Sequence, residues 1–421
     1  MADPADGLNA YLVGGAVRDA LLGIRVADRD WVVVGATPEE MLERGFKPAG
    51  ADFPVFLHPR SGEQYALARR ERKTARGYKG FDIISDPSIT LEQDLQRRDL
   101  TINAIASDAD GKLIDPFGGA ADIEGRTLRH ISDAFAEDPV RVLRAARFRA
   151  RFDKLGFRVH PQTRELMAQM TANGEVDALQ PERVWNELHG ALSAPGAARF
   201  IEELRACGAL AKVLPEVDAL FGVPQPEKHH PEIDTGAHIL LALDAAQRLS
   251  DDPRVAFAVL AHDLGKALTP AAALPAHHGH ERAGLKPVDE MCARLRAPEK
   301  YRELARAVCE FHLHHHRLPE LKPATALKLL ERLDAFRRPE ILELFSLACT
   351  ADLRGRTGRE DAPCPQADLL RRYHRAAADV DAAAVAAQFK NEGAKIKTAL
   401  RRERTAAIAA VKGGRGARTV V

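Results

Sequence analysis

A chain of 421 residues is long enough for two to four domains, each with its own hydrophobic core. Its 61 Lys and Arg residues almost balance its 60 Asp and Glu residues, so contact with nucleic acid would need a local basic face. The five cysteines form no C-x-x-C pair, which argues against a disulfide framework or a thiolate zinc site. The chain shows neither an apolar leader nor a run of about 18 apolar residues, so we expect a cytoplasmic protein without a membrane partner.

Short strands and helices are predicted to mix over residues 10 to about 125. The apolar, β-branched runs that predict strands are residues 31–34, 55–57, 64–68 and 112–114. Residues 69–78 are basic and interrupted by glycine, which predicts a mobile loop. A helical pattern begins near residue 135, with Pro139 at a helix start, and persists to about residue 410. The basic, glycine-rich residues 411–421 are predicted to be disordered.

Two carboxylates, Asp28 and Asp30, stand at the start of the first of these strands. Residues i and i+2 of a strand point to the same face, so both side chains should project together. Paired carboxylates suit Mg²⁺, and two such ions can clamp the attacking and leaving oxygens of a phosphoryl displacement. The preceding pair Gly14-Gly15 would let the backbone approach phosphates closely. The alternative is a turn followed by a solvated acidic loop; the register of the glycines, Arg18 and the strand favours the metal site.

Four motifs follow one another in the first 150 residues: YLVGGAVRDALLG with DRD, RRDLTINAIA (97–106), IDPFGGAADIEGRTLRH (114–130) and EDPVRVLRAARF (137–148). In this order they closely resemble the class II tRNA nucleotidyltransferases, the CCA-adding enzymes of the polymerase-β-like superfamily. The later motifs HPEIDTGAH and AHDLGKALTP resemble the HD phosphohydrolase module of bacterial multifunctional CCA proteins. The resemblance covers residues 10 to about 410.

The resemblance implies an α+β protein, in which a polymerase-β-like nucleotidyltransferase palm precedes a mostly α-helical body that includes an HD domain. Four parts are expected along the chain. They are a palm at residues 1–130, a helical nucleotide-selecting neck at 131–225, an HD phosphohydrolase domain at 226–360, and a helical region with a disordered basic tail at 361–421.

The same resemblance implies template-independent addition of CCA to the 3′ end of tRNA from CTP and ATP, with release of pyrophosphate. It also implies phosphatase and 2′,3′-cyclic phosphodiesterase activity of the HD domain. The expected cofactors are Mg²⁺ for the transferase and Ni²⁺ or another divalent transition metal for the HD site. The expected partners are tRNA, CTP and ATP, and the expected assembly is a monomer or weak homo-oligomer. The alternatives are a poly(A) polymerase-like nucleotidyltransferase and a tRNA-binding HD hydrolase with an inactive head.

By resemblance, Asp28 and Asp30 are the catalytic metal ligands. The residues that match nucleotide-binding positions are Gly15, Arg18, Arg98, Asp138, Arg141, Arg144 and Arg147. For Arg98 the alternative is an ion pair with Asp99 or another acid, and for Arg144 and Arg147 it is a solvated basic face. Arg183 and Glu187 match a later motif and are expected to brace the nucleotide-selecting helix. Glu63 lies by an expected strand, but no third carboxylate is assigned.

The choice of base can be argued from Asp138 and Arg141, which are i,i+3 neighbours if both lie on one helix. A carboxylate only accepts hydrogen bonds and a guanidinium only donates them. Together they suit the pairing edges of cytosine and adenine, which present an amino donor beside a ring-nitrogen acceptor. Uracil and guanine place a carbonyl where the carboxylate needs a donor. The alternative is an ordinary salt bridge within the helix.

The HD resemblance implies a metal site made by His238, His262, Asp263 and a distant acid, for which Asp352 is the candidate. Imidazole and carboxylate suit a divalent ion without choosing which one. Further histidines could add ligands or bind phosphate (His277, His278, His280), or could lie solvated in a loop (His312, His314, His315, His316).

Overall fold

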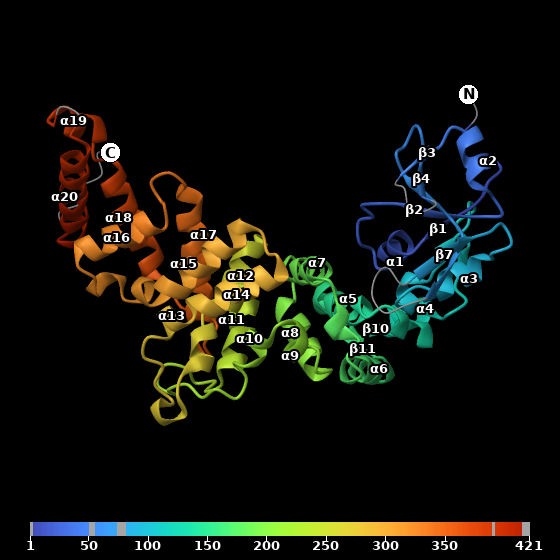
Figure 1. The fold of residues 1–421 in the computed structure, drawn as a ribbon, viewed down its shortest axis with the longest axis horizontal. Coiled ribbons are helices and arrows are strands. Elements are labelled where there is room, and N and C mark those ends of the chain that lie inside the picture. Colours follow the sequence, from blue (N-terminus) through green and yellow to red (C-terminus); the bar gives the residue numbers. More distant parts are fainter. Residues whose placement is uncertain (1–2, 50–54, 74–80, 390–391, 415–421) are drawn as a thin grey trace. The chain divides into compact units, whose positions relative to one another are not determined.

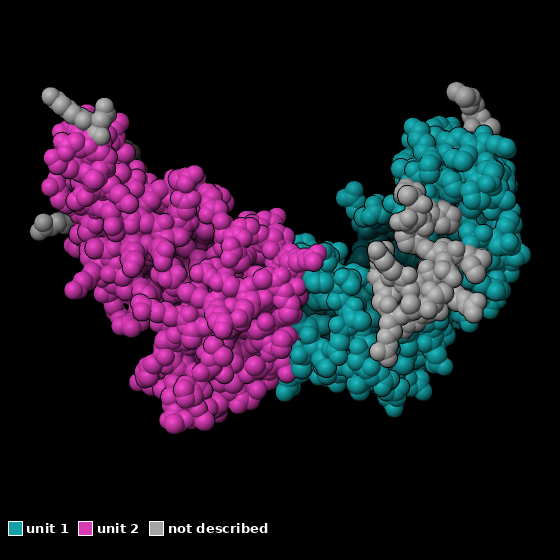
Figure 2. Space-filling view, in the orientation of Figure 1, with its two compact units in different colours: residues 1–191, 199–213 teal, residues 192–198, 214–421 magenta. Residues whose placement is uncertain are grey.

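The computed structural model describes residues 3–49, 55–73, 81–389 and 392–414. The chain forms two compact units, coloured separately in Figure 2. Unit 1 comprises residues 1–191 and 199–213, and unit 2 comprises residues 192–198 and 214–421. Among the described residues, no helix has the length and apolar character needed to cross a membrane. The finer division into four parts remains a prediction.

Unit 1 is built around a seven-stranded sheet in the order β3-β4-β5-β2-β1-β8-β9. Its strands are β1 (Asn9–Val13), β2 (Asp30–Val34), β3 (Lys47–Pro48), β4 (Val55–Leu57), β5 (Gln64–Leu67), β8 (Ala106–Ser107) and β9 (Leu113–Ile114). The central strand β2 pairs antiparallel with β1 and parallel with β5, which places Asp30 opposite Val13 and Gln64. The four strands expected from the sequence are confirmed to within a residue or two at their ends.

A separate two-stranded antiparallel ribbon, β6 (Arg69–Lys73) with β7 (Phe81–Ser85), leaves the end of β5. The prediction of a loop over residues 69–78 is therefore wrong for residues 69–73, while residues 74–80 lie outside the described part of the chain. The error has a physical reason. Basic residues indicate contact with solvent, but a strand forms wherever a partner backbone completes its hydrogen-bond ladder.

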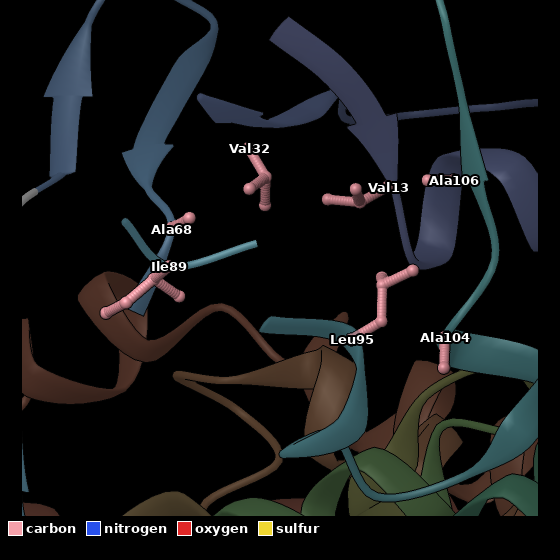
Figure 3. Close-up of a cluster of buried hydrophobic side chains, with 7 residues drawn as sticks. All are labelled: Val13, Val32, Ala68, Ile89, Leu95, Ala104 and Ala106. Atoms are coloured by element: carbon pink, nitrogen blue, oxygen red, sulfur yellow. The ribbon is translucent and has the colours of Figure 1, made fainter. Parts of the chain in front are cut away.

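The sheet face that carries Asp30 is buried against helix α3 (Leu91–Gln96). Residues two apart in β2 share a face, so Val32 lies on the same side as Asp30. Figure 3 shows Val32 and Val13 facing Leu95 of α3 in one cluster of buried side chains. Packing therefore fixes the face on which Asp30 projects and brings the residues after α3 next to it.

The remaining helices of unit 1 pack around and after the sheet (Figure 1). They are α1 (Gly15–Leu21), α2 (Pro38–Glu43), α4 (Gly119–Glu124), α5 (Val140–Arg151), α6 (Pro161–Ala172), α7 (Pro181–Leu192), α8 (Ala197–Ala206) and α9 (Leu210–Val213). Pro139 directly precedes α5, as predicted, because proline is tolerated at a helix start. The short strands β10 (Thr127–Leu128) and β11 (Arg158–Val159) pair in parallel beside α5.

The described part of unit 2 is helical (Figure 1). Its helices are α10 (Pro215–Asp218), α11 (Thr235–Leu249), α12 (Pro253–Ala261), α13 (His280–Ala283), α14 (Leu285–Leu295), α15 (Glu299–His316), α16 (Pro323–Arg332), α17 (Pro339–Arg354), α18 (Pro365–Ala378), α19 (Ala382–Ala387) and α20 (Gly393–Lys412). Helices α11, α12, α15 and α17 pack on one another.

Two expectations for unit 2 need correction. The histidines at 312–316 lie in the last turns of α15 and not in a loop. Helix α20 continues to Lys412, so the start of the expected disordered tail is helical. Residues 415–421 lie outside the described part of the chain. In both cases polar composition suggested exposed loop, whereas packing against neighbouring helices stabilises the helix.

We expect Leu95→Ala to destabilise unit 1 by about 2–5 kcal/mol, because it leaves a cavity in a core where Leu95 is fully buried. Both tryptophans of the chain, Trp31 and Trp185, lie in unit 1, so urea unfolding followed by tryptophan fluorescence reports on this unit. The control Leu42→Ala removes a side chain that is 51% exposed and should change stability by less than about 0.5 kcal/mol. Equal effects of the two substitutions would contradict the assignment of this core.

Candidate functional site

The first candidate site is a cavity of about 520 Å³ in unit 1, at the start of β2 and beside α5. Its lining contains more arginines than carboxylates, which suits an anionic ligand. The lining residues are Gly14, Gly15, Arg18, Asp30, Arg97, Arg98, Asp99, Asn103, Asp138, Val140, Arg141, Arg144, Phe148, Arg183, Asn186 and Glu187. Among the residues selected from the sequence, Asp28 and Arg147 are not part of this lining.

Asp30 begins β2, and Asp28 stands two residues before it in an exposed segment. Partial burial raises the pKa of Asp30, Arg98 opposes the rise, and the neighbouring charge of Asp28 adds to it. The two carboxylates are thus close enough to repel each other. A divalent cation with oxygen ligands would relieve that repulsion, so the pair fits such an ion.

Glu63 is turned away from this pair. Its Oε2 accepts a hydrogen bond from the indole Nε1 of Trp31 at 2.9 Å. Trp31 alternates with Asp30 along β2 and therefore lies on the opposite face of the sheet. Glu63 is held on that face, so the structure gives it no position beside Asp28 and Asp30.

Arg98 is placed over the glycine turn by a buried carboxylate. Asp94, whose side chain is fully buried, contacts Arg98 Nη2 at 3.2 Å and Arg97 Nη2 at 2.8 Å. A Cβ atom added to Gly14 would lie 2.7 Å from Arg98 Nη1, so the guanidinium would have to move away from this turn. The alternative of an ion pair with another acid is thus confirmed, with Asp94 and not Asp99 as partner. Arg98 nevertheless lines the cavity.

Asp99 is a buried carboxylate in the cavity lining. It accepts hydrogen bonds from the backbone N–H of Leu100 at 2.9 Å, Asn103 Nδ2 at 2.8 Å and Arg144 Nε at 2.8 Å. Burial favours the neutral acid, but Arg144 and these hydrogen bonds outweigh it and lower the pKa of Asp99 to about 2. Asn103 in turn accepts from buried Arg18, which also donates to Asp19. The carboxylate therefore stays ionised and connects two cavity arginines.

Asp138 is not on the helix that carries Arg141. It has extended backbone angles and precedes α5, so the prediction of two helical i,i+3 neighbours is wrong. Proline at position 139 favours an extended conformation for the residue before it. The carboxylate of Asp138 is held by Arg183, whose Nη1 and Nη2 donate to it at 3.0 and 2.7 Å. Arg141 donates to the carbonyl oxygens of Ala134 and Arg97.

Arg183 and Glu187 of α7 were expected to brace the nucleotide-selecting helix, and both contact residues at or before α5, while the selecting role itself stays a prediction. Arg183 binds Asp138, and Glu187 Oε2 accepts from Arg147 Nε at 2.5 Å. Glu187 Oε1 also lies 4.0 Å from Arg144 Nη1. Arg144 thus reaches the cavity between two carboxylates, whereas Arg147, which pairs with Glu187, is itself not part of the cavity lining.

The second candidate site lies in unit 2, where the four expected ligands are brought together. Asp263 follows α12 directly after His262. His238 Nε2 in α11 lies 3.1 Å from Asp352 Oδ1 in α17. His262 Nε2 lies 3.2 Å from Asp263 Oδ2 and 3.8 Å from Asp352 Oδ1. All four side chains are buried, and His238, His262 and Asp352 could hold one metal ion.

Three more histidines reach this cluster. His280 Nε2 lies 3.2 Å and His312 Nε2 lies 3.7 Å from Asp263 Oδ1. His316 Nε2 lies 2.6 Å from Asp352 Oδ2. The prediction of a solvated histidine run is therefore wrong, because α15 turns His312 and His316 toward the buried acids and His315 is fully buried. Of the first group of histidines, His277 binds Thr269 and the carbonyl oxygen of Pro224, and His278 is exposed.

Glu232 and Lys266 belong to this site and were not selected from the sequence. Glu232 Oε1 lies 3.0 Å from His238 Nδ1 and 2.9 Å from His230 Nδ1. Lys266 Nζ lies 2.6 Å from Asp263 Oδ2. Both residues lie inside the motifs HPEIDTGAH and AHDLGKALTP. Their closeness in the sequence to the expected ligands could have identified them.

Three family models match the chain. The poly A polymerase head domain matches residues 10–129, the probable RNA and SrmB-binding site of polymerase A matches 156–221, and the HD domain matches 235–339. Among curated relatives, the multifunctional CCA protein of Thioalkalivibrio sulfidiphilus (strain HL-EbGR7) is 61% identical over 87% of this chain and 90% of its own length. That of Alkalilimnicola ehrlichii (strain ATCC BAA-1101 / DSM 17681 / MLHE-1) is 59% identical over 96% of this chain and 98% of its own length.

The fold is similar to that of solved CCA-adding enzymes. The Bacillus stearothermophilus CCA-adding enzyme in complex with CTP is 25% identical with a TM-score of 0.63, and the match covers 98% of this chain and 94% of that chain. A CCA-adding enzyme solved with ATP is 19% identical with a TM-score of 0.64, which shows the shared fold alone.

We expect Gly14→Ala to weaken binding of a nucleoside triphosphate to unit 1. The added Cβ displaces Arg98, and losing a hydrogen bond to a charged group costs about 1.5–3 kcal/mol, or about 10- to 150-fold in affinity. The matched control is Gly23→Ala, because Gly23 has nearly the same backbone angle (φ 67° against 66°) but nothing within 4 Å of the added Cβ. Each substitution should also lower stability, because both glycines have a positive φ, and Gly14 with ψ −122° lies outside the left-handed helical region. Titration calorimetry with CTP that gave equal affinities for both variants would contradict this role of Gly14.

Proposed function

The chain belongs to the family of multifunctional CCA proteins, and on that premise we propose which residues carry its two activities. The protein adds CCA to the 3′ end of tRNA from CTP and ATP with release of pyrophosphate, and its HD domain is a phosphohydrolase. The observation that carries the transferase assignment is one cavity in which Asp30 faces several arginines. Identity of 61% to a multifunctional CCA protein over most of the chain favours this function over a poly(A) polymerase.

In unit 1 we assign Asp28 and Asp30 as the ligands of Mg²⁺, which when bound neutralises the triphosphate and activates the tRNA 3′-hydroxyl. The pair suits this ion because both carboxylates offer oxygen atoms and repel each other. The guanidinium groups of Arg18, Arg98 and Arg144 line the same cavity and would bind the phosphate oxygens. Gly14 and Gly15 leave room for the phosphates beside the backbone.

We assign base selection to Asp138 and Arg141, at the end of the cavity where α5 begins. Arg183 holds the Asp138 carboxylate with two hydrogen bonds, so its orientation is set before a base arrives. Each carboxylate oxygen can accept more than one hydrogen bond, which leaves room for the amino group of cytosine or adenine. Arg141 donates to two carbonyl oxygens at this end of the cavity, and its guanidinium carries only donors, which suits the acceptor atoms of cytosine and adenine. Arg147 is assigned to positioning α7 through Glu187.

In unit 2 we assign His238, His262, Asp263 and Asp352 to a divalent transition metal such as Ni²⁺. The mixed nitrogen and oxygen donors fit such an ion, and Nδ1 of His262 donates to the carbonyl oxygen of Val259, which leaves Nε2 with its lone pair. The ion when bound supplies an activated water for attack on a phosphoester. Glu232 orients His238 from the other side of its ring.

The remaining assignments are broader. We propose that tRNA is the macromolecular partner, bound through basic surface, since the net charge is only +1. We assign the palm to residues 1–130, the neck to 131–225, the HD domain to 226–360 and the last helical part to 361–421. We propose a cytoplasmic location and a monomer or weak homo-oligomer.

Asp28→Asn or Asp30→Asn should lower CCA addition at least about 100-fold, because a bound cation supplies several kcal/mol of charge stabilisation. Hydrolysis of a 2′,3′-cyclic nucleotide should persist in these variants, and His262→Asn should show the reverse pattern. The measurement is incorporation of CTP and ATP into tRNA lacking its CCA end, run beside cyclic-nucleotide hydrolysis. The control Asp110→Asn removes an exposed acid and should leave both activities intact. Loss of both activities in folded Asp28→Asn protein would refute the two-site assignment.

Asp138→Ala should reduce discrimination against UTP and GTP. Loss of a charged hydrogen bond costs about 1.5–3 kcal/mol, so the ratio of kcat/KM values for CTP over UTP should fall about 10- to 150-fold. Single-nucleotide incorporation with each of the four nucleoside triphosphates measures these ratios. The control is Asp133→Ala, an exposed acid in the same segment. If Asp138→Ala slowed all four nucleotides equally, the residue would be structural and base selection would lie elsewhere.

A further inference from the structure

Glu63 contacts the two residues that flank Asp30. Its Oε2 accepts the hydrogen bond from Trp31 Nε1 at 2.9 Å, and its Oε1 lies 3.9 Å from Arg29 Nη1. Trp31 follows Asp30 in the chain, and Arg29 lies between the two carboxylates assigned to Mg²⁺. Glu63 thus reaches both neighbours of Asp30 from the sheet face opposite to that of the Asp30 side chain.

Trp31 is fixed on that face by two residues of the β4–β5 hairpin. It lies opposite buried Tyr65 in the parallel ladder of β2 and β5, and the two rings stack with centroids 5.6 Å apart and an interplanar angle of 10°. Stacking fixes the plane of the indole, and the hydrogen bond to Glu63 fixes its Nε1 edge. Because Trp31 and Asp30 share one peptide bond, a fixed indole limits the movement of the backbone that carries the Asp30 carboxylate.

Glu63 is itself held in the turn between β4 and β5. The backbone N–H of His58 donates to the carbonyl oxygen of Glu63 at 2.9 Å. The backbone N–H of Ser61 donates to Nδ1 of the buried His58 ring at 3.1 Å. Glu63 directly precedes β5, which pairs with both β4 and β2. Its carboxylate therefore starts from a backbone that the sheet fixes on two sides.

Asp28 is the carboxylate of the pair that most needs such support. The ladder between β1 and β2 ends at Asp30, and Asp28 lies in the exposed segment before it. Two carboxylates this close repel each other whenever no cation lies between them. A contact at Arg29 opposes the separation, but an exposed ion pair of this kind is weak. The hydrogen bond from Trp31 to Glu63 is therefore the stronger of the two restraints.

We propose that Glu63 is a positioning residue of the transferase site: through Trp31, and more weakly through Arg29, it preorganises Asp28 and Asp30 for Mg²⁺. This inference rests on the proposed assignment of that pair as the metal ligands. A site that is arranged before the ion arrives binds it more tightly, because no cost of ordering the ligands is subtracted from the binding free energy. Loss of a residue that orients metal ligands typically weakens metal binding about 10- to 100-fold.

The test measures binding of Mn²⁺, in place of Mg²⁺, to the full chain with His262→Asn, which removes a ligand of the HD site. The electron paramagnetic resonance signal of free Mn²⁺ gives the dissociation constant of the site that Asp30→Asn abolishes. Glu63→Ala should raise this constant about 10-fold. Trp31→Phe should do the same, because phenylalanine keeps an aromatic ring but lacks the indole N–H. Glu63→Gln still offers an oxygen to Trp31 and should raise the constant only about 2-fold, as expected for loss of an exposed ion pair. The control Glu124→Ala removes an exposed acid of α4 and should leave it unchanged.

An unchanged dissociation constant in folded Glu63→Ala protein would overturn the inference. An equal loss in Glu63→Gln would overturn it too, since the hydrogen bond to Trp31 would then not be what positions the pair. Mn²⁺ binding that survives Asp30→Asn unchanged would instead refute the assignment of the Mg²⁺ ligands. Circular dichroism melting checks that each variant is folded. Should Glu63→Ala fail to fold, Trp31→Phe decides the matter by the same criterion.

Discussion

The ion pair between Asp99 and Arg144 joins the sheet-bearing part of unit 1 to the helices that follow it. A carboxylate buried without a partner would cost several kcal/mol, so Asp99 can be inside only because Arg144, Asn103 and the Leu100 N–H meet it. Both residues of this pair line the cavity. Asp94, another buried acid, holds Arg98, a further lining residue, beside the glycine turn. In unit 1, ion pairs with buried carboxylates thus position the arginines that line the cavity.

Unit 2 buries carboxylates too, but it meets them mainly with imidazoles. Asp263 and Asp352 lie among histidines from α11, α13, α15 and the end of α12. An arginine is always protonated and gives a permanent ion pair, whereas a neutral imidazole offers a lone pair to a metal. Burial lowers the pKa of His312 well below its ordinary value, which keeps that ring neutral. Buried carboxylates paired with arginines therefore form a site for an anion in unit 1, whereas buried carboxylates beside neutral histidines form a candidate metal site in unit 2.

The sequence was sufficient where a local pattern decides the outcome. The strand that begins at Asp30 and the helix after Pro139 were each predicted from neighbouring residues and found in place. It failed where the decision came from a distant partner. Arg69–Lys73 forms a strand because Phe81–Ser85 completes its ladder, and His312 turns inward because α15 packs beside Asp263.

The order of the motifs by itself determined the family and the α+β class, and it selected candidate residues such as Asp30, Arg98 and His262, since these follow from residue type and short spacing. Only the tertiary structure decided their partners: Arg183 and not Arg141 for Asp138, Asp94 and not Asp99 for Arg98, and His280 with His312 for Asp263. The physical reason is that a buried charge is compensated by whichever opposite or neutral donor group the packing brings within about 3 Å. That choice depends on how elements far apart in the chain pack, which short sequence patterns do not encode.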